Sequence, residues 1–265
     1  MTLRLLRQST RILVINPNSS ESMTHGVEEA IRRMSLSPTT EIYTYTAPPS
    51  SPPSINTGED VALSADVVSA DLKGKLGDYD AVLVACYSVH PLVQRLARDN
   101  PHLAVTGIFE ASVLAALSLL GPPVAGVGEG EKERMWGVVT TGKFWEAHLT
   151  DGVKHFLGQG RGEGNAKFGG VESTGLNAGD FHGGVDPAVI RQKLREATQR
   201  LLGKGPVECV AMGCAGMAGL EDIIRDATRE KHGNEQAEKL FVVDGVLAGV
   251  GLLETTVKNR RMFRK

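Results

Sequence analysis

Cysteine is scarce in this chain of 265 residues, and that scarcity limits the class of protein. Three cysteines are present, an odd number that does not form the disulfide framework typical of small secreted domains. Free thiols persist in a reducing compartment, so we expect a cytoplasmic protein. Only 5% of the residues are aromatic, whereas 41% are apolar, which is ordinary for a globular chain.

A strong excess of charge and long apolar runs are also missing. The net charge is −2, so no nucleic-acid or anionic-membrane partner is expected. No run of 18 apolar residues occurs, which predicts no transmembrane helix. The start, MTLRLLRQSTRILVINP, lacks the apolar core and cleavage site of a signal peptide. Its three arginines before Ile12 weakly resemble a transit peptide, but a short lead into the first strand is the simpler interpretation.

Strand-like and helix-like segments alternate along the chain. The pattern predicts an α/β fold of two pseudo-symmetric lobes, each with a mainly parallel sheet flanked by helices, and an active site in the cleft between the lobes. We expect residues 11–120 plus 240–262 in lobe 1 and residues 121–239 in lobe 2. The linker candidate is Gly121–Arg134, and residues 161–185 form a long Gly-rich excursion in which no strand is expected.

A topological repeat underlies the prediction of two lobes. Asn16 and Cys86 end strands of the first half, and Thr141 and Cys214 end strands of the second half at a similar spacing. Each of these two cysteines follows an apolar strand and is expected to precede a helix. Because ligands bind at the carboxyl ends of parallel strands, two facing lobes would bring both thiols to one cleft. Cys209 lies inside its strand and is expected only to pack.

Two opposed thiols suit one reaction in particular. Racemisation beside a carbonyl needs a base on one face of the carbon and an acid on the other. A thiolate and a thiol provide both without a cofactor, and a helix N-terminus would favour the thiolate. The neighbours of Cys214 are small: Gly213, Ala215 and Gly216. They would leave its thiol uncovered and let backbone N–H groups approach a ligand. The alternative is that both cysteines are inert buried residues.

Six motifs occur in order over residues 11–255: INPNSSESMT, ACYS, GIFEAS, VVTTGKFW, GCAGM and VVDGV. Together they resemble the hydantoin/allantoin racemase branch of the Asp/Glu racemase superfamily. ACYSVHPLV and GVESTGLNAGDFHGG most resemble the fungal DCG1-type members of that branch.

The resemblance implies a cofactor-independent, two-lobe racemase whose catalytic residues are Cys86 and Cys214. It also implies a set of residues that line the substrate: Asn16, Pro17, Asn18, Thr140, Thr141 and Gly142. Bacterial members often carry an acidic residue shortly after the first cysteine, in Cys-Phe-Ser-Asp. Here Val89 and His90 follow Ser88 instead. The resemblance therefore does not define the side chain of the substrate, although it still implies the pair of cysteines.

Several polar residues near these motifs have two interpretations. Asn16 and Thr141 could donate to a carbonyl oxygen where enolate charge develops. Ser88 either anchors that oxygen or caps the next helix, and His90 either contacts substrate or simply starts that helix. Glu110 is either an acid behind the site or a first-turn acid of a helix. Asp244 and Gly245 either border the cleft or form a plain turn.

The expected function is racemisation of a 5-substituted hydantoin or allantoin at C5. The expected binding partner is this small ring substrate, and the protein is expected to form a homo-oligomer. No metal is expected, because the histidines show no ligand spacing, and the resemblance implies a reaction without a cofactor. GVVTTGKF lacks the Ser/Thr of a phosphate-binding loop. The alternatives are a decarboxylase or maleate-type isomerase of the same superfamily, and a non-catalytic protein that binds a ureide or an amino acid.

Overall fold

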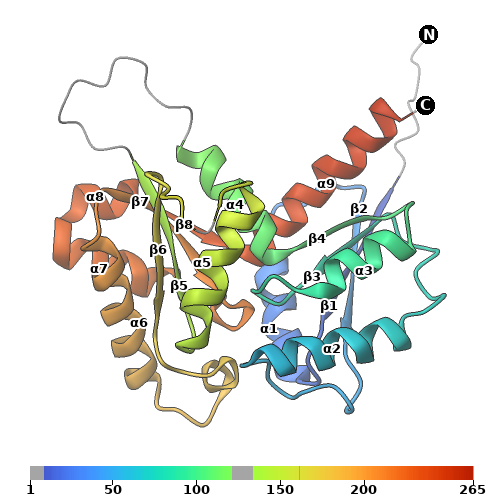
Figure 1. The fold of residues 1–265 in the computed structure, drawn as a ribbon, viewed down its shortest axis with the longest axis horizontal. Helices are drawn as coiled ribbons and strands as arrows, with labels where there is room; N and C mark the ends of the chain where they lie inside the picture. Colours follow the sequence, from blue (N-terminus) through green and yellow to red (C-terminus); the bar gives the residue numbers. More distant parts are fainter. Residues whose placement is uncertain (1–8, 121–133, 161, 265) are drawn as a thin grey trace.

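Two parallel sheets form the framework of the residues that the computed structural model describes, 9–120, 134–160 and 162–264 (Figure 1). The strand orders are β2-β1-β3-β4 and β6-β5-β7-β8. The strands are β1 Thr10–Asn16, β2 Thr40–Thr46, β3 Ala81–Val84, β4 Ala104–Gly107, β5 Met135–Thr140, β6 Phe168–Ser173, β7 Val207–Gly213 and β8 Phe241–Asp244. The second order repeats the first with every number raised by four, so Cys86 after β3 and Cys214 after β7 occupy equivalent places.

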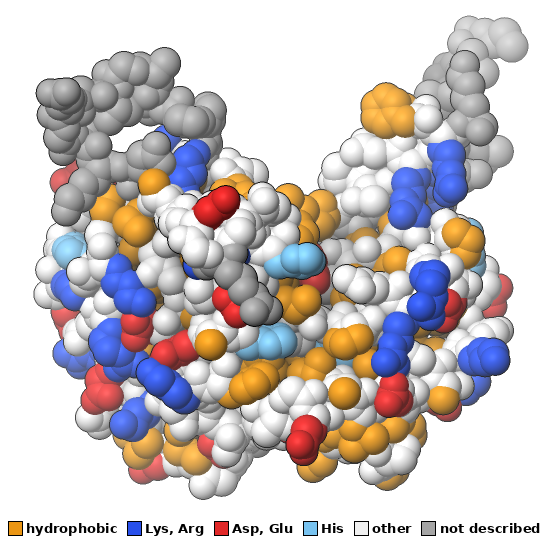
Figure 2. Space-filling view, in the orientation of Figure 1, with side chains coloured by type: hydrophobic (Ala, Val, Ile, Leu, Met, Phe, Trp, Pro, Cys, Tyr) orange, Lys and Arg blue, Asp and Glu red, His pale blue; other side chains and the backbone are white. Residues whose placement is uncertain are grey.

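The helices cover both faces of each sheet. They are α1 Glu21–Arg32, α2 Gly58–Asp71, α3 Pro91–Asp99, α4 Ile108–Leu120, α5 Phe144–Phe156, α6 Pro187–Leu202, α7 Glu221–His232, α8 Asn234–Lys239 and α9 Gly245–Phe263, with 3-10 helices η1 Ala178–His182 and η2 Ala215–Met217. The α/β class with two helix-flanked parallel sheets is confirmed. Acidic and basic side chains are interspersed over the flanks seen in Figure 2, as the small net charge predicts.

Alternating residues of each strand point into different cores. Leu13, Ile15 and Val82 pack under α2 and α3 on the outer face of the first sheet. Val139, Val210 and Met212 pack under α6 and α7 on the outer face of the second sheet. The inner faces share one large core with α1, α4, α5 and α9. The two sheets therefore enclose a common layer of helices, which fixes their strand ends relative to each other.

Two of the inner helices cross between the halves. α4 follows β4 but packs against β7 and β8, whereas α9 follows β8 but packs against β3 and β4. Of residues 240–262, which were expected in lobe 1, strand β8 instead pairs with β7 in the second sheet. Otherwise the division into lobes stays a prediction, and the linker Gly121–Arg134, apart from Arg134, lies outside the described residues.

Local signals place most helix starts. Asp186 caps α6 as predicted, because its Oδ1 accepts a hydrogen bond of 2.8 Å from the N–H of Ala188. The Gly-rich excursion, however, contains strand β6, which the sequence did not predict. The helix after Cys86 starts at Pro91, as its proline predicts, but the helix expected directly after Cys214 begins later, at Glu221, apart from the short η2. In the part of the chain that the structure describes, no helix has both the length and the apolar character needed to cross a bilayer.

Candidate functional site

One pocket lies where the carboxyl ends of the two sheets meet. It encloses about 470 Å³ of space, part of it open to solvent. Both sheets and several loops contribute its walls: Asn16, Asn18, Met23, Val27, Ile55, Ala85, Cys86, Tyr87, Thr141, Trp145, Ala178, Gly213, Cys214, Ala215 and Gly216. Eight of these were expected from the sequence, so the equivalent strand ends do converge on one space.

The two thiols enter the pocket from opposite halves. Cys86 follows β3, and Cys214 follows β7; both are partly exposed. The Sγ of Cys86 lies 3.4 Å from the Oγ of Ser88. The Sγ of Cys214 accepts a hydrogen bond of 3.3 Å from the N–H of Gly216, because Cys214 caps η2. Cys209, in contrast, is fully buried within β7, as expected.

Burial favours the protonated form of both thiols. It raises the pKa of Cys86 to about 12, an effect that Ser88 opposes and that Cys214 and Glu110 reinforce. It raises the pKa of Cys214 to about 11, against the lowering effect of the N–H groups of Gly216 and Met217. Because a charge on Cys214 disfavours a charge on Cys86, the pair favours one thiolate beside one thiol over two thiolates.

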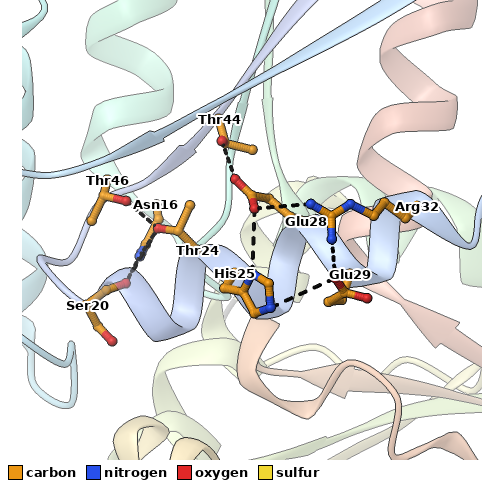
Figure 3. A network of polar contacts seen from close by, with 9 residues as sticks. All are labelled: Asn16, Ser20, Thr24, His25, Glu28, Glu29, Arg32, Thr44 and Thr46. Atoms are coloured by element: carbon orange, nitrogen blue, oxygen red, sulfur yellow. Dashed lines mark hydrogen bonds and ion pairs between the residues drawn. The ribbon is translucent and has the colours of Figure 1, made fainter.

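Asn16 is held by its own loop and does not offer a free donor. Its Nδ2 donates to Asn18 Oδ1, to the carbonyl of Ser20 and to Thr24 Oγ1, each at 3.0 Å. Its Oδ1 accepts from the N–H of Asn18. Figure 3 shows the amide directed into α1, with Thr24 also bonded to Thr46. The hypothesis that Asn16 donates to a substrate carbonyl is therefore corrected: Asn16 shapes the loop that presents Asn18.

Two other polar groups in the pocket remain available. The Nδ2 of Asn18 has only the thioether of Met23, at 3.1 Å, as an acceptor, and sulfur of this kind is a weak one. The hydroxyl of Thr141 has no hydrogen-bond partner within the described ranges, although its carbonyl accepts from Gly175 and Thr174. Both residues line the pocket and are largely buried. They are two neutral side-chain donors of the pocket lining, one from each half.

Several residues expected at the substrate lie behind the pocket instead. The hydroxyl of Thr140 donates a hydrogen bond of 2.8 Å to the carbonyl of Gly213 and so links β5 to β7. His90 caps α3 through Nδ1, and its Nε2 lies 3.1 Å from Ser64 Oγ, which confirms the helix-start interpretation. Burial lowers the pKa of His90 to about 4, so it is neutral at neutral pH.

The remaining predicted contacts also have structural roles. Ser88 does not cap α3 but contacts Cys86. Val89 packs between the halves beside Gly152 of α5. Pro17 accepts a hydrogen bond from Ser51 through its carbonyl, and Gly142 lies in the turn before α5 near Trp145. None of these four is among the residues that line the described pocket.

Glu110, Asp244 and Gly245 lie near the junction of α4 and α9. Asp244 caps α9, since its Oδ1 accepts from the N–H groups of Val246 and Leu247 at 2.7 and 3.2 Å. A Cβ at Gly245 would lie 3.0 Å from Ser112 Oγ, so glycine permits close contact with α4. Neither Asp244 nor Gly245 is among the residues that line the pocket. Glu110 is also outside its lining, but its charge acts on Cys86.

The sequence did not identify the apolar wall. Met23 and Val27 come from the buried face of α1, and Trp145 comes from α5. Ile55 comes from the loop before α2, and Ala178 is the first residue of η1 in the other half. The two segments meet where the N–H of Ala178 donates a hydrogen bond of 3.2 Å to Asn56 Oδ1. The helix residues repeat at core spacing, so nothing in the sequence marks them as pocket residues.

The pocket wall is uncharged. Within the described part of the chain its lining contains no Lys, Arg, His, Asp or Glu. No cluster of three or more His, Cys, Asp or Glu residues suitable for a metal is found among the described residues. The arrangement therefore suits a neutral ligand that is held by amide and hydroxyl donors and lies between two thiols.

Comparison with known proteins agrees with this geometry. The chain is 29% identical to a hydantoin racemase of a Pseudomonas species, over 93% of this chain and 86% of that protein. It is 27% identical to Protein DCG1 of Saccharomyces cerevisiae, over 94% and 97%. The structure of allantoin racemase from Klebsiella pneumoniae matches with a TM-score of 0.71 and 26% identity, over 94% of this chain and 88% of that one.

A family model described as Asp/Glu/Hydantoin racemase matches residues 12–253. That range contains every residue of the pocket and both sheets, apart from the first two residues of β1. The chain therefore belongs to the Asp/Glu/hydantoin racemase family and is an isomerase.

Proposed function

We propose that this protein racemises a 5-substituted hydantoin or allantoin by proton transfer between Cys86 and Cys214. The observation that carries the proposal is that both thiols line one pocket from equivalent strand ends of the two sheets. A carbon between them can lose a proton on one face and gain one on the other. A single thiol, or two thiols in separate spaces, would not support this reaction.

Each proton transfer is balanced within the pair. One cysteine thiolate takes the C5 proton, and the C–H electron pair moves into the ring as an enolate. The other cysteine donates its S–H proton to the opposite face, which restores the C–H bond with inverted configuration. The ring carbonyl acidifies C5–H, so the chain's own residues are sufficient for the step.

The negative charge that develops on the enolate oxygen needs neutral hydrogen-bond donors, which stabilise the charge and keep their protons. Asn18 Nδ2 and the Thr141 hydroxyl are available for it, because neither is occupied by a strong internal partner. Neutral donors aimed at a developing oxyanion typically contribute about 3 kcal/mol each. Asn18→Ala should therefore lower kcat/KM by roughly a hundredfold, whereas Asn16→Ala should also destabilise the loop.

The uncharged wall favours a cyclic ureide over a free acid. Glutamate, aspartate, malonates and maleate carry carboxylates at neutral pH, and burying one without a cationic partner is costly. The pocket lining contains no cationic side chain among the described residues. Hydantoin and allantoin rings are neutral and present carbonyl and N–H groups, which amide and hydroxyl side chains can match.

The test is chiral chromatography of enantiopure allantoin and several 5-substituted hydantoins incubated with the protein in chelator. We expect loss of optical purity and, in D₂O, exchange of C5–H for deuterium. Cys86→Ser and Cys214→Ser should each lower the rate at least about a hundredfold, with Cys209→Ser as the matched control that retains it. No racemisation and no exchange with any of these rings would overturn the proposal; turnover of maleate or malonates would favour the alternative reactions, and thermal stabilisation by a ring without turnover would indicate a binding protein.

A further inference from the structure

Each thiol of the pocket has a hydrogen-bond partner two residues after it in the chain. In the second half, the N–H of Gly216 donates to the Sγ of Cys214 at 3.3 Å. In the first half, the Oγ of Ser88 lies 3.4 Å from the Sγ of Cys86. Equivalent positions therefore provide the same contact in two ways, with a backbone N–H in one half and a side-chain hydroxyl in the other.

The backbone of the two turns explains this difference. The N–H of Ser88 donates to the carbonyl of Cys86 at 3.0 Å, so it is not available to the sulfur. In the second half, the carbonyl of Cys214 accepts from the N–H of Met217 at 3.1 Å, one residue further along, which leaves the N–H of Gly216 for the thiol. In the first turn the side chain of Ser88 takes the place of that backbone donor.

The hydroxyl of Ser88 has no other role in the part of the chain that the structure describes. Ser88 is fully buried, and Cys86 Sγ is the one hydrogen-bond partner found there for its hydroxyl. Cys86 lines the pocket, whereas Ser88 does not. Ser88 therefore acts on a ligand in the pocket through Cys86 and not by direct contact.

The contact between the hydroxyl and the sulfur depends on the charge of Cys86. In the thiol form either group can donate, but a thiolate can only accept. Hydrogen bonds to a charged acceptor are the stronger kind, so the hydroxyl stabilises the thiolate more than the thiol. The titratable groups that act on Cys86 are Cys214, after β7, and Glu110, in α4, and both disfavour its charge. Ser88 opposes them and the effect of burial.

We propose that Ser88 is a positioning residue for Cys86, whose hydroxyl orients the thiol and donates to the sulfur whenever Cys86 is ionised. This inference rests on the proposed racemase function for its role in catalysis. Cys86 stays protonated in most molecules, and the hydroxyl increases the small fraction that is thiolate. Cys86 is ionised before it accepts a proton from one enantiomer and after it donates a proton to form that enantiomer, so Ser88 assists both directions of the reaction.

The experiment measures the alkylation of each thiol by iodoacetamide at pH 9 in the full-length protein, resolved by peptide mass spectrometry. Both thiols line one pocket, so the rate at Cys214 reports reagent access in every variant. In Ser88→Ala we expect Cys86 to be alkylated about threefold to tenfold more slowly, because a hydrogen bond to the thiolate is lost, and Cys214 to change less than about twofold. Ser88→Thr keeps a hydroxyl and should stay within about twofold of the parent.

The matched control is Ser112→Ala. Ser112 is equally buried, but its hydroxyl donates to the carbonyl of Ile108 within α4 at 2.7 Å, so its removal should alter neither thiol. An unchanged Cys86 rate in Ser88→Ala, an equal fall at both thiols, or a fall in Ser88→Thr as large as in Ser88→Ala would overturn the inference.

Turnover gives a second measurement for Ser88→Ala. The rate constant kcat for racemisation should fall by about the same factor as the labelling of Cys86, and KM should change less than about twofold, because Ser88 does not line the pocket. A rise in KM with kcat unchanged would assign Ser88 to substrate contact and overturn the inference. Labelling is independent of turnover, so a protein that shows the Ser88 effect on Cys86 but racemises no ring would refute the proposed function alone.

Discussion

Replacement of Gly152 by alanine tests how tightly the two halves pack around the pocket. Gly152 lies in α5, and a Cβ there would be 2.5 Å from Val89 Cγ2 and 3.1 Å from Phe109 Cζ. Ordinary carbon contacts are about 3.5–4.0 Å, so Val89 must move by about 1 Å. Val89 lies three residues after Cys86, which connects this contact to the position of the thiol.

The expected free-energy change has two opposing parts. Alanine is favoured over glycine in a helix interior by about 1 kcal/mol, whereas an extra methyl in a packed core costs about 1–3 kcal/mol. The clash exceeds the gain in most of this range, so Gly152→Ala should lose up to about 2 kcal/mol. For a chain of this size that corresponds to a Tm lower by roughly 2–8 °C.

The assay is thermal and urea unfolding of the variant beside a matched control. Gly251→Ala, in α9, places its Cβ 3.7 Å from Met34 Cε, an ordinary contact, and should stabilise by up to about 1 kcal/mol. Adding Val89→Ala to Gly152→Ala should return part of the loss, seen as a favourable coupling energy in the double-mutant cycle. If Gly152→Ala raises Tm as Gly251→Ala does, the reasoning about this contact is refuted.

Three further predictions concern the site and its supports. Burial raises the pKa of both Cys86 and Cys214, so the thiolate fraction grows with pH and kcat/KM should rise about tenfold per pH unit between about pH 7 and 9; a plateau beginning below pH 8 would contradict this. Cys209→Ala should leave racemisation within about twofold of the parent while it lowers stability by about 1 kcal/mol, and a large loss of activity in the folded variant would assign Cys209 a role beyond packing. Thr140→Val removes the donor to the carbonyl of Gly213 and should cost about 1–3 kcal/mol in urea unfolding, whereas an unchanged midpoint would show that this bond contributes little.

The sequence predicted the features that depend on strand ends. Cys86 and Cys214 could be placed because parallel strands bring their carboxyl ends to one edge, whatever the packing details. Cys209 could be separated from Cys214 because it lies within the apolar run of β7. These inferences need only the order of elements, which local patterns carry well.

Features that depend on packing or on a local irregularity were not predictable in the same way. Strand β6 was missed because its pairing with β5 shifts register beside Gly169 and Gly170, and Gly170 has φ +97°. A bulge of this kind interrupts the alternation that marks a strand. The helix after Cys214 was expected too early. Gly219 has φ +86°, which is not a helical conformation, so α7 begins only after it.

Asn16 shows a different limit of the sequence. Its position at the end of β1 correctly places it at the pocket, but the destination of its amide hydrogens depends on how α1 packs beside it. A spacing argument cannot separate Asn16 from Asn18, two residues later. The structure does so because only one of the two amides has strong internal acceptors.

The crossing of α4 and α9 has a consequence for the order of folding. The inner face of the first sheet is covered by α9, the last helix of the chain, so this face remains open while the second half is being synthesised. Exposed apolar surface of this kind makes a partly folded chain prone to aggregation. We therefore expect the partly synthesised chain to be prone to aggregation until α9 docks, and deletion of α9 should impair folding of the first half more than that of the second.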